Sequence, residues 1–121
     1  MKRNIFFLIP LLILLSNSVP AEPALTLISP NGGEELISGK TFMIKWNYED
    51  SANSDKNVIL VLYKNGIKFI TISESTSNTG SFIWTIPSET PSGNKYRIRI
   101  RSQKELSLND FSDRDFSILK Q

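Results

Sequence analysis

The sequence contains no histidine and no cysteine among its 121 residues. Without histidine, a Ser-His-Asp triad, a Cys-His pair and a histidine-based metal site are all excluded. Without cysteine, neither a disulfide nor a lipid-modified lipoprotein cysteine can form. A domain of about 100 residues can still bury a sufficient hydrophobic core without disulfides. The missing residue types therefore argue against common catalytic sites but not against a stable fold.

The chain also lacks an apolar run long enough to span a membrane. Its apolar run covers residues 5–15, whereas a spanning helix needs about 20 apolar residues. A short basic start, this run and small residues before Ala21 are typical of a secretory signal peptide. We therefore predict a signal peptide at residues 1–21, a domain at 22–121 with no membrane span, and a secreted, extracellular or cell-envelope location. An uncleaved signal anchor is the alternative.

An excess of positive charge is absent from the predicted mature domain. The whole chain has 14 Lys and Arg against 12 Asp and Glu. Removing residues 1–21 removes Lys2 and Arg3 and no acidic residue, which leaves 12 of each sign. Because a nucleic-acid-binding domain is expected to be net basic, we expect no nucleic-acid partner.

Short segments of alternating apolar and polar residues recur along the chain, and no long segment has a helical period. Phe42, Ile44, Trp46 and Tyr48 fall on one face of residues 41–48, the pattern of a half-buried strand. An Asn-Gly pair between two alternating runs indicates a hairpin. Strands are expected at residues 25–28, 35–37, 41–48, 57–63, 67–73, 81–86, 95–102 and 113–119, with loops at 49–57, 73–80 and 87–94, and at most one helical turn in 103–110.

This spacing of strands and turns predicts an all-β fold, an immunoglobulin-like antiparallel β-sandwich of about seven strands. Tyr96 lies at the entry to the penultimate strand, where a tyrosine corner would bond its hydroxyl to the backbone of the preceding loop. We expect Trp46, Trp84 and the other inward aromatic residues to pack in the core, because aromatic side chains dominate core burial.

Several segments in this order are similar to one protein family: SPNGGE (29–34), IKWNY (44–48), VILVLYKNG (58–66), TGSFIWTIP (79–87), GNKYRIRI (93–100) and SDRDFSI (112–118). The set resembles the Kre/Knh-like N-terminal domain of yeast cell-wall synthesis proteins. The same domain occurs in Ser/Thr-rich GPI-anchored fungal surface proteins, and exported bacterial and archaeal proteins contain relatives of it. The resemblance implies an immunoglobulin-like sandwich outside the cytoplasm. In fungi it implies a role in cell-wall β-1,6-glucan assembly, without an established catalytic site. Because residues 1–121 contain neither a Ser/Thr-rich stalk nor a hydrophobic GPI-anchor tail, we expect a departure from the fungal pattern in these two features.

No motif for catalysis is evident. The Gly-rich segment 29–34 lacks the Lys-Ser/Thr that a phosphate loop requires, and Gly32 and Gly33 are interpreted as turn residues with positive φ. The carboxylate pairs Glu34-Glu35 and Glu49-Asp50 could serve glycoside hydrolysis, but they fall in turns, where charged residues are usually solvated. We therefore expect no enzyme activity and no cofactor.

Two groups of oxygen-bearing side chains are candidates for calcium, which prefers oxygen ligands. One lies in the loop at 49–57, and the other lies near the last turn. Neither spacing matches the EF-hand pattern, and a single loop rarely supplies the six or more oxygens that calcium requires. We therefore interpret both as solvated loops and predict no metal site. The two groups are Asp50, Asn53 and Asp55, and Asp110, Asp113 and Asp115.

The segment KYRIRIRS (95–102) places a row of basic residues on the outer face of one strand: Lys95, Arg97, Arg99 and Arg101. In the predicted sandwich this strand lies between residues 57–63 and 113–119. Its outer neighbours would be exposed Ile59 and Val61 with Tyr63 on one side, and Asp113, Asp115 and Ser117 on the other.

Two interpretations of this row remain open. Arginine stems could simply cover the apolar residues while the aspartates pair with them across strands. Alternatively, the row forms a platform for an acidic glycan or protein, because arginine suits bidentate binding of carboxylate or phosphate. The candidate binding face comprises Tyr63, Arg97, Arg99, Arg101, Ile59 and Val61.

The sequence therefore predicts an exported, non-catalytic module that binds or scaffolds at the cell surface or cell wall. Its expected partner is a cell-surface glycan or an extracellular protein. The alternatives are a small enzyme that processes wall polysaccharides, and a structural envelope protein that forms a homodimer through Ile59 and Val61.

Overall fold

Nine strands form the fold in residues 24–49 and 57–121, which are the residues that the computed structural model describes. They are β1 (Ala24–Ser29), β2 (Glu35–Ile37), β3 (Thr41–Glu49), β4 (Asn57–Lys64), β5 (Ile67–Ser77), β6 (Ser81–Thr85), β7 (Gly93–Ser102), β8 (Asn109–Phe111) and β9 (Phe116–Leu119). Within these ranges no helix has the length and apolarity that crossing a membrane requires. The predicted signal peptide and the loop that carries Asp50, Asn53 and Asp55 lie outside the described residues.

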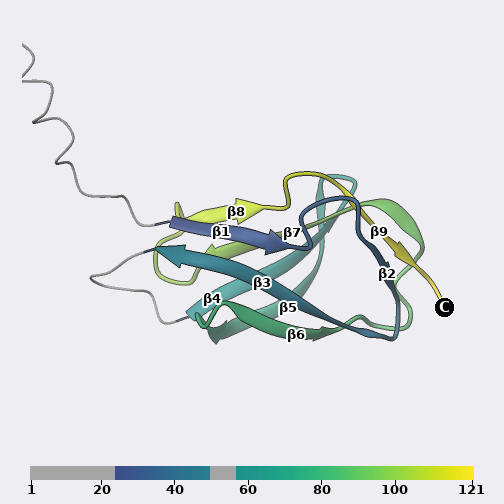
Figure 1. Cartoon of the computed structure of the whole chain (residues 1–121), viewed down its shortest axis with the longest axis horizontal. Coiled ribbons are helices and arrows are strands. Elements are labelled where there is room, and N and C mark those ends of the chain that lie inside the picture. The colour runs from purple at the N-terminus through teal and green to yellow at the C-terminus, as the bar shows by residue number, and fades with distance from the viewer. Residues whose placement is uncertain (1–23, 50–56) are drawn as a thin grey trace, which may run out of the picture.

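The strands form two sheets that face each other (Figure 1). The smaller sheet has the order β1-β3-β6, and the larger has the order β2-β9-β7-β4-β5, with β8 also paired to β7. The pairings are antiparallel except for β2 with β9, which is parallel. The predicted immunoglobulin-like sandwich is thus confirmed, with one parallel pairing near an edge of the larger sheet that was not expected.

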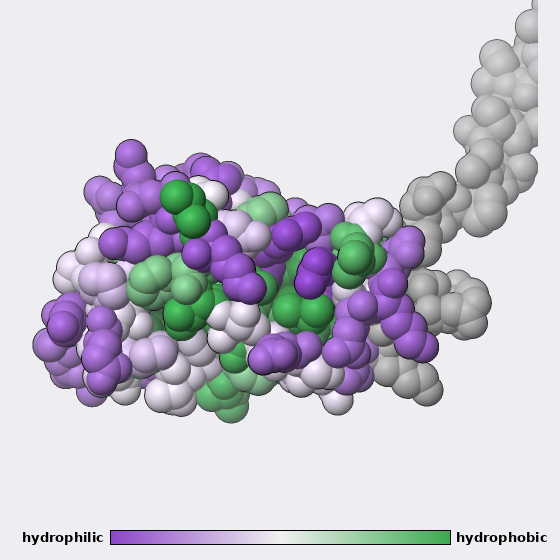
Figure 2. Space-filling model, turned by 180° about the vertical axis from the view of Figure 1, so that it is seen from behind, coloured by the Kyte–Doolittle hydropathy of each residue, from purple (hydrophilic) through white to green (hydrophobic). Residues whose placement is uncertain are grey.

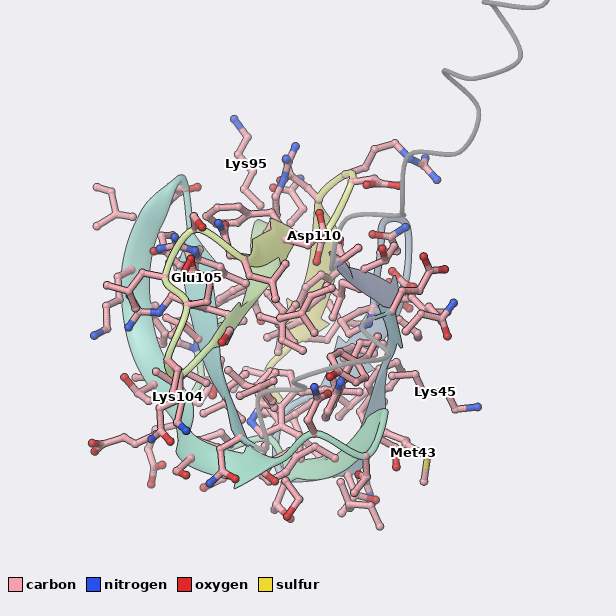
Figure 3. The ribbon with its side chains drawn as sticks, turned by 90° about the vertical axis from the view of Figure 1, so that its left-hand side faces the viewer. Met43, Lys45, Lys95, Lys104, Glu105 and Asp110 are labelled. Atoms are coloured by element: carbon pink, nitrogen blue, oxygen red, sulfur yellow. The ribbon has the colours of Figure 1, made fainter. Side chains whose placement is uncertain are left out.

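The core lies between the sheets and is built by the alternation of apolar residues along the strands. Every second residue of β3, β4 and β7 points inward, and the side chains fill the space between the layers (Figure 3). Met43 and Lys45 point away from the body of the molecule on the smaller sheet. Trp46 and Trp84 are only 2% and 3% exposed, which confirms the expectation that they pack in the core.

Tyr96 forms the tyrosine corner that its position predicted. Its side chain is fully buried, and its hydroxyl donates a hydrogen bond of 2.6 Å to the backbone carbonyl of Pro91. A buried hydroxyl requires such a partner, because an unpaired one is costly. Burial raises the pKa of Tyr96 above its ordinary value. The bond fixes the connection between β6 and β7 against the core.

The Gly-rich segment 29–34 is a turn, as expected. Gly32 and Gly33 have positive φ of 143° and 88°. The Glu34 carboxylate accepts hydrogen bonds from the backbone N–H groups of Asn31 at 2.9 Å and Gly32 at 2.8 Å. Glu34 is therefore part of the turn, and the proposed pairing with Glu35 as catalytic carboxylates is not supported by this geometry.

β5 is longer than predicted and replaces most of the loop expected at 73–80. It continues to Ser77, and its pairing with β4 contains three register irregularities. Each adds an extra residue to β5, so that its eleven residues run beside the eight of β4. The Ser-rich end was misread as a loop because polar residues there stand at a sheet edge, where they remain solvated.

β8 was not predicted, because three residues offer no alternation to recognise. It pairs with β7 in the larger sheet, and the carboxylate of its Asp110 accepts a hydrogen bond from the backbone N–H of Leu27 at 2.8 Å. β8 therefore joins the larger sheet to β1 of the smaller one, and Figure 1 shows the two strands side by side.

Candidate functional site

The basic row of β7 has the neighbours on β4 that the alternation predicted. Arg97 lies opposite Tyr63, Arg99 opposite Val61, and Arg101 opposite Ile59. All of these side chains belong to the outer face, because the alternate residues of both strands are buried in the core. The six residues of the candidate binding face therefore lie on two adjacent strands of one sheet.

On the other side of β7 the expected aspartate neighbours are only partly in place. β9 pairs with the beginning of β7, and β8 takes over farther along, where Phe111 lies opposite Arg99. Asp113 and Asp115 precede β9 rather than belonging to it. Asp113 accepts a hydrogen bond from the Asn31 side chain at 2.9 Å, not from an arginine. The expectation that both aspartates flank the row was wrong, because β9 begins too late to reach it.

Asp115 nevertheless forms an ion pair with Arg97. The Nε of Arg97 donates to the carboxylate at 2.8 Å, and its Nη1 donates to the carbonyl of Ser112 at 3.4 Å. The side chains of the pair are 42% and 40% exposed. A pair this exposed contributes about 1 kcal/mol or less to stability. Its main effect is to orient a guanidinium and a carboxylate beside each other on the outer face.

Arg99 is held by neutral groups. Its Nε donates to the side-chain oxygen of Asn109 at 3.2 Å, and its Nη1 donates to the hydroxyl of Tyr63 at 3.4 Å. Its guanidinium carbon lies 5.3 Å from the centre of the Phe111 ring, within range of a cation–π interaction. The rings of Tyr63 and Phe111 meet edge to face, 5.0 Å apart and at 73°. Two aromatic rings and one arginine thus form a single cluster on the sheet.

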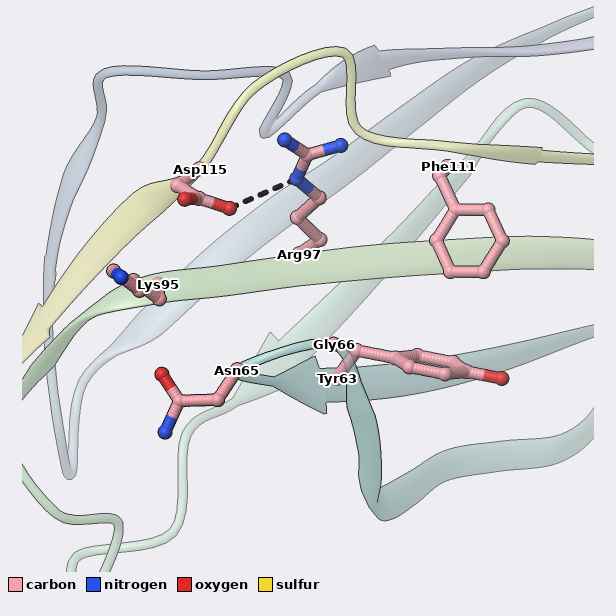
Figure 4. A pocket seen from close by; sticks show the side chains of 7 residues that line it. All are labelled: Tyr63, Asn65, Gly66, Lys95, Arg97, Phe111 and Asp115. Atoms are coloured by element: carbon pink, nitrogen blue, oxygen red, sulfur yellow. Dashed lines mark hydrogen bonds and ion pairs between the residues drawn. The ribbon is translucent and has the colours of Figure 1, made fainter.

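A cavity of about 680 Å³ lies next to this cluster (Figure 4). Tyr63 and Phe111 lie at one end of it, Lys95 and Asn65 lie at the other, and the Arg97–Asp115 pair borders it. Its volume is within the range of small-ligand sites, which combine apolar walls with a few polar groups. Its lining residues are Tyr63, Asn65, Gly66, Lys95, Arg97, Phe111 and Asp115. We call these residues, together with Arg99, the β7 pocket.

Sequence reasoning missed two members of the β7 pocket. Phe111 was not assigned to a face, because it follows a segment without alternation and belongs to the unpredicted β8. Asn65 was recognised only as a hairpin residue, and it does occupy the turn between β4 and β5 with a positive φ of 54°. The Asn-Gly pair predicted the turn. It did not predict that the pairing of β4 with β7 brings this turn beside Lys95.

The remaining members of the predicted face lie elsewhere. Ile59, Val61 and Arg101 line a separate hollow of about 460 Å³ with residues of β5 and Gln103. Val61 is only 8% exposed, so the expectation that it is exposed was wrong. The contact between Arg99 and Tyr63 lies between the two hollows along β7. The predicted face is thus two sites rather than one.

Hydrophobic side chains do not form one continuous patch on this side of the molecule. Figure 2, the view from behind Figure 1, shows them in separate groups between hydrophilic side chains. Large contiguous apolar patches mark many protein-protein interfaces. This view therefore shows no large contiguous apolar patch of that kind.

The aspartates near the last turn have separate partners rather than a common centre. Asp110 bonds to Leu27, Asp113 to Asn31, and Asp115 to Arg97. Across residues 24–49 and 57–121, no three acidic side chains are grouped so that they could hold a metal ion. The loop with the other calcium candidates lies outside these residues.

Comparison with known proteins gave one match. No curated protein and no solved structure matches the chain. The family model described as the Kre9/KNH-like N-terminal Ig-like domain matches residues 29–118, which is most of the chain. The match includes all described strands except the first five residues of β1 and the last residue of β9. This confirms the resemblance that the motifs indicated: the chain belongs to the family of Kre9/KNH-like N-terminal Ig-like domains.

Proposed function

We propose that this protein is an exported, non-catalytic module that binds a glycan at the cell surface or cell wall through the β7 pocket. The family is associated with cell-wall and cell-surface proteins and is not a known enzyme family. The layout of residues 1–21 as a signal peptide supports export, with the domain beginning at residue 22. N-terminal sequencing of the secreted protein tests this part, and a first residue other than Glu22 would move the cleavage site.

The observation that carries the proposal is the aromatic pair beside planar polar groups. Tyr63 and Phe111 present ring surface to the β7 pocket, and such surface packs well against the apolar faces of a sugar ring. The Arg97–Asp115 pair offers donors and acceptors in a direction set by its ion pair, and the Asn65 amide adds one more group of each kind. Sugar hydroxyls need both kinds of group at once.

The same pocket argues against a glycosidase. Hydrolysis of a glycosidic bond generally uses two carboxyl groups on opposite sides of that bond. Among the lining residues of the β7 pocket, Asp115 is the only carboxylate, and it is already paired with Arg97. A second carboxylate to act as acid or nucleophile is not among them. Binding without turnover fits this set of residues better.

The structure gives less support than the sequence did to the alternative of a homodimer formed through Ile59 and Val61. That alternative relied on Ile59 and Val61 as an exposed apolar face, but Val61 is buried and Ile59 is half-buried. Little apolar area remains there for a partner to cover, whereas stable interfaces bury about 800 Å² on each partner.

A glycan array probed with the purified secreted protein tests the proposal, followed by calorimetric titration with the best-binding oligosaccharide. Tyr63→Ala and Phe111→Ala should each weaken binding about tenfold or more, since each removes ring surface. Ile83→Ala serves as the control, because Ile83 is exposed on the smaller sheet. Hydrolysis of the bound glycan, or equal affinities for all three variants, would refute the proposal.

A further inference from the structure

We infer that the glycan taken by the β7 pocket is anionic, with a carboxylate on its sugar units, and that Arg99 and Lys95 are the residues that select it. This inference rests on the proposed function, because it names the ligand class of the same site. It comes from the distribution of charge around the pocket.

The β7 pocket has an uncompensated positive charge. The charged residues that line the cavity are Lys95, Arg97 and Asp115, and Arg99 lies beside it, in contact with the lining residues Tyr63 and Phe111. Arg97 and Asp115 form an ion pair at 2.8 Å and neutralise each other. The partners of Arg99 are an amide, a phenol and an aromatic ring, none of which carries a compensating charge. Two positive charges therefore remain without an acidic partner, Lys95 in the lining of the cavity and Arg99 beside its aromatic end.

This excess is local, because the predicted mature domain is formally neutral with 12 basic and 12 acidic residues. Charge of one sign that lines a concave surface concentrates the field there and attracts ligands of opposite charge. A pocket for a neutral sugar does not need this arrangement. The segregation of charge on a neutral domain therefore favours an anionic ligand.

Arg99 also has hydrogen-bonding capacity left for a ligand. A guanidinium has five N–H donors, and the bonds of Arg99 to Asn109 and Tyr63 use one on Nε and one on Nη1. These bonds and the Phe111 ring hold the planar group in place. A fixed guanidinium with free N–H groups is suited to binding a carboxylate with two parallel hydrogen bonds.

The spacing of the cations favours carboxylates over a phosphate or sulfate group with clustered charge. Lys95 and Arg99, the two cations without an acidic partner, are four residues apart on one extended strand, so their backbone positions are about 13 Å apart. Two single charges at this separation match a polymer that carries its negative charges on separate sugars. A dense multivalent anion would be better served by cations that converge on one point.

Titration of the secreted protein with four oligosaccharides of equal length tests the inference. The probes are an oligogalacturonate, its methyl ester, a neutral glucose oligomer and a sulfated glucose oligomer. The oligogalacturonate should bind about tenfold more tightly than its methyl ester, because esterification removes the charge and keeps the ring. Its affinity should also fall between about 50 mM and about 500 mM salt, as expected for charge pairing at an exposed site.

Two variants locate the effect. Arg99→Gln and Lys95→Gln should each bring the affinity for oligogalacturonate down toward that for the methyl ester. Lys95 is exposed at the rim, so its variant reports on binding even where Arg99→Gln disturbs the aromatic cluster. Lys45→Gln is the matched control, since Lys45 projects from the smaller sheet (Figure 3).

The possible failures are distinguishable. Equal binding of the acidic probe and its ester, both sensitive to Tyr63→Ala, would overturn the anionic ligand and keep the glycan-binding site. Preference for the sulfated probe over oligogalacturonate would overturn the carboxylate. If no probe binds and the array is also negative, the proposed function and this inference are both wrong.

Discussion

The carboxylate of Asp110 accepts a hydrogen bond of 2.8 Å from the backbone N–H of Leu27, 83 residues earlier in the chain. Leu27 belongs to β1, the edge strand of the smaller sheet, and Asp110 belongs to β8 at the larger sheet. Leu27 is 2% exposed, so its N–H lies next to the core and would be poorly solvated. The Asp110 side chain thus connects the two sheets at this edge of the sandwich, where β1 and β8 are not paired as strands.

Asp110→Ala should lower the free energy of unfolding by about 1–3 kcal/mol, because it leaves the Leu27 N–H without its charged acceptor. Urea denaturation followed by tryptophan fluorescence measures the change. Asp113→Ala is the control, since the bond of Asp113 to Asn31 is exposed, and it should cost less than about 1 kcal/mol. Equal costs for the two variants would show that the Asp110 bond has no special role.

Tyr96→Phe should destabilise the domain by about 1–2 kcal/mol, because it removes the hydroxyl that bonds to Pro91 and keeps the buried ring. Tyr63→Phe removes a hydroxyl with only a longer contact of 3.4 Å to Arg99 at the surface. It should therefore change the same free energy by less than about 0.5 kcal/mol. Thermal and urea unfolding of both variants would reveal the difference, and its absence would contradict the tyrosine corner as a stabilising bond.

The stability of the domain should fall as the pH rises above about 10, the ordinary pKa of tyrosine. Burial raises the pKa of Tyr96 in the folded state, so the unfolded chain loses this proton at a lower pH than the folded chain. The contribution is fully present below the unfolded pKa and is lost as the pH rises through the folded pKa. Urea midpoints measured from neutral to alkaline pH should decline less steeply for Tyr96→Phe than for the unmodified protein. Parallel declines would assign the alkaline loss to other groups.

Gly32→Ala should cost more stability than Gly33→Ala, although both glycines have positive φ. A Cβ on Gly32 would lie 2.6 Å from the Cβ of Arg114, whereas a Cβ on Gly33 would have nothing within 4 Å. Gly33→Ala should therefore show only the backbone cost, about 1–2 kcal/mol, and Gly32→Ala should add the steric cost to it. Melting temperatures of the two variants rank them, and the reverse order would contradict the close approach of the two turns.

Much of this fold follows from local patterns, because eight of the nine described strands have an alternation or a flanking turn that stands out in the sequence. The placement of Arg97 opposite Tyr63 was predictable in the same way, since the alternation of residues along β4 and β7 puts both side chains on the outer face. Phe111 was not, because β8 exists only through its pairing with β7. A three-residue strand has no period of its own, so the aromatic half of the β7 pocket depends on a long-range contact.

The irregular pairing of β5 has a consequence for the behaviour of the protein at high concentration. β5 is an eleven-residue edge strand with a free side, and it carries Ile67 and Phe69 at 71% and 40% exposure. Such an edge would ordinarily recruit other chains and seed fibrils. Its three extra residues interrupt the even spacing of backbone donors and acceptors, so a straight strand from a neighbouring molecule finds no continuous match. Two of these irregularities lie between Lys68 and Ser73, and the third lies between Ser73 and Thr76, in the segment that looked like a loop.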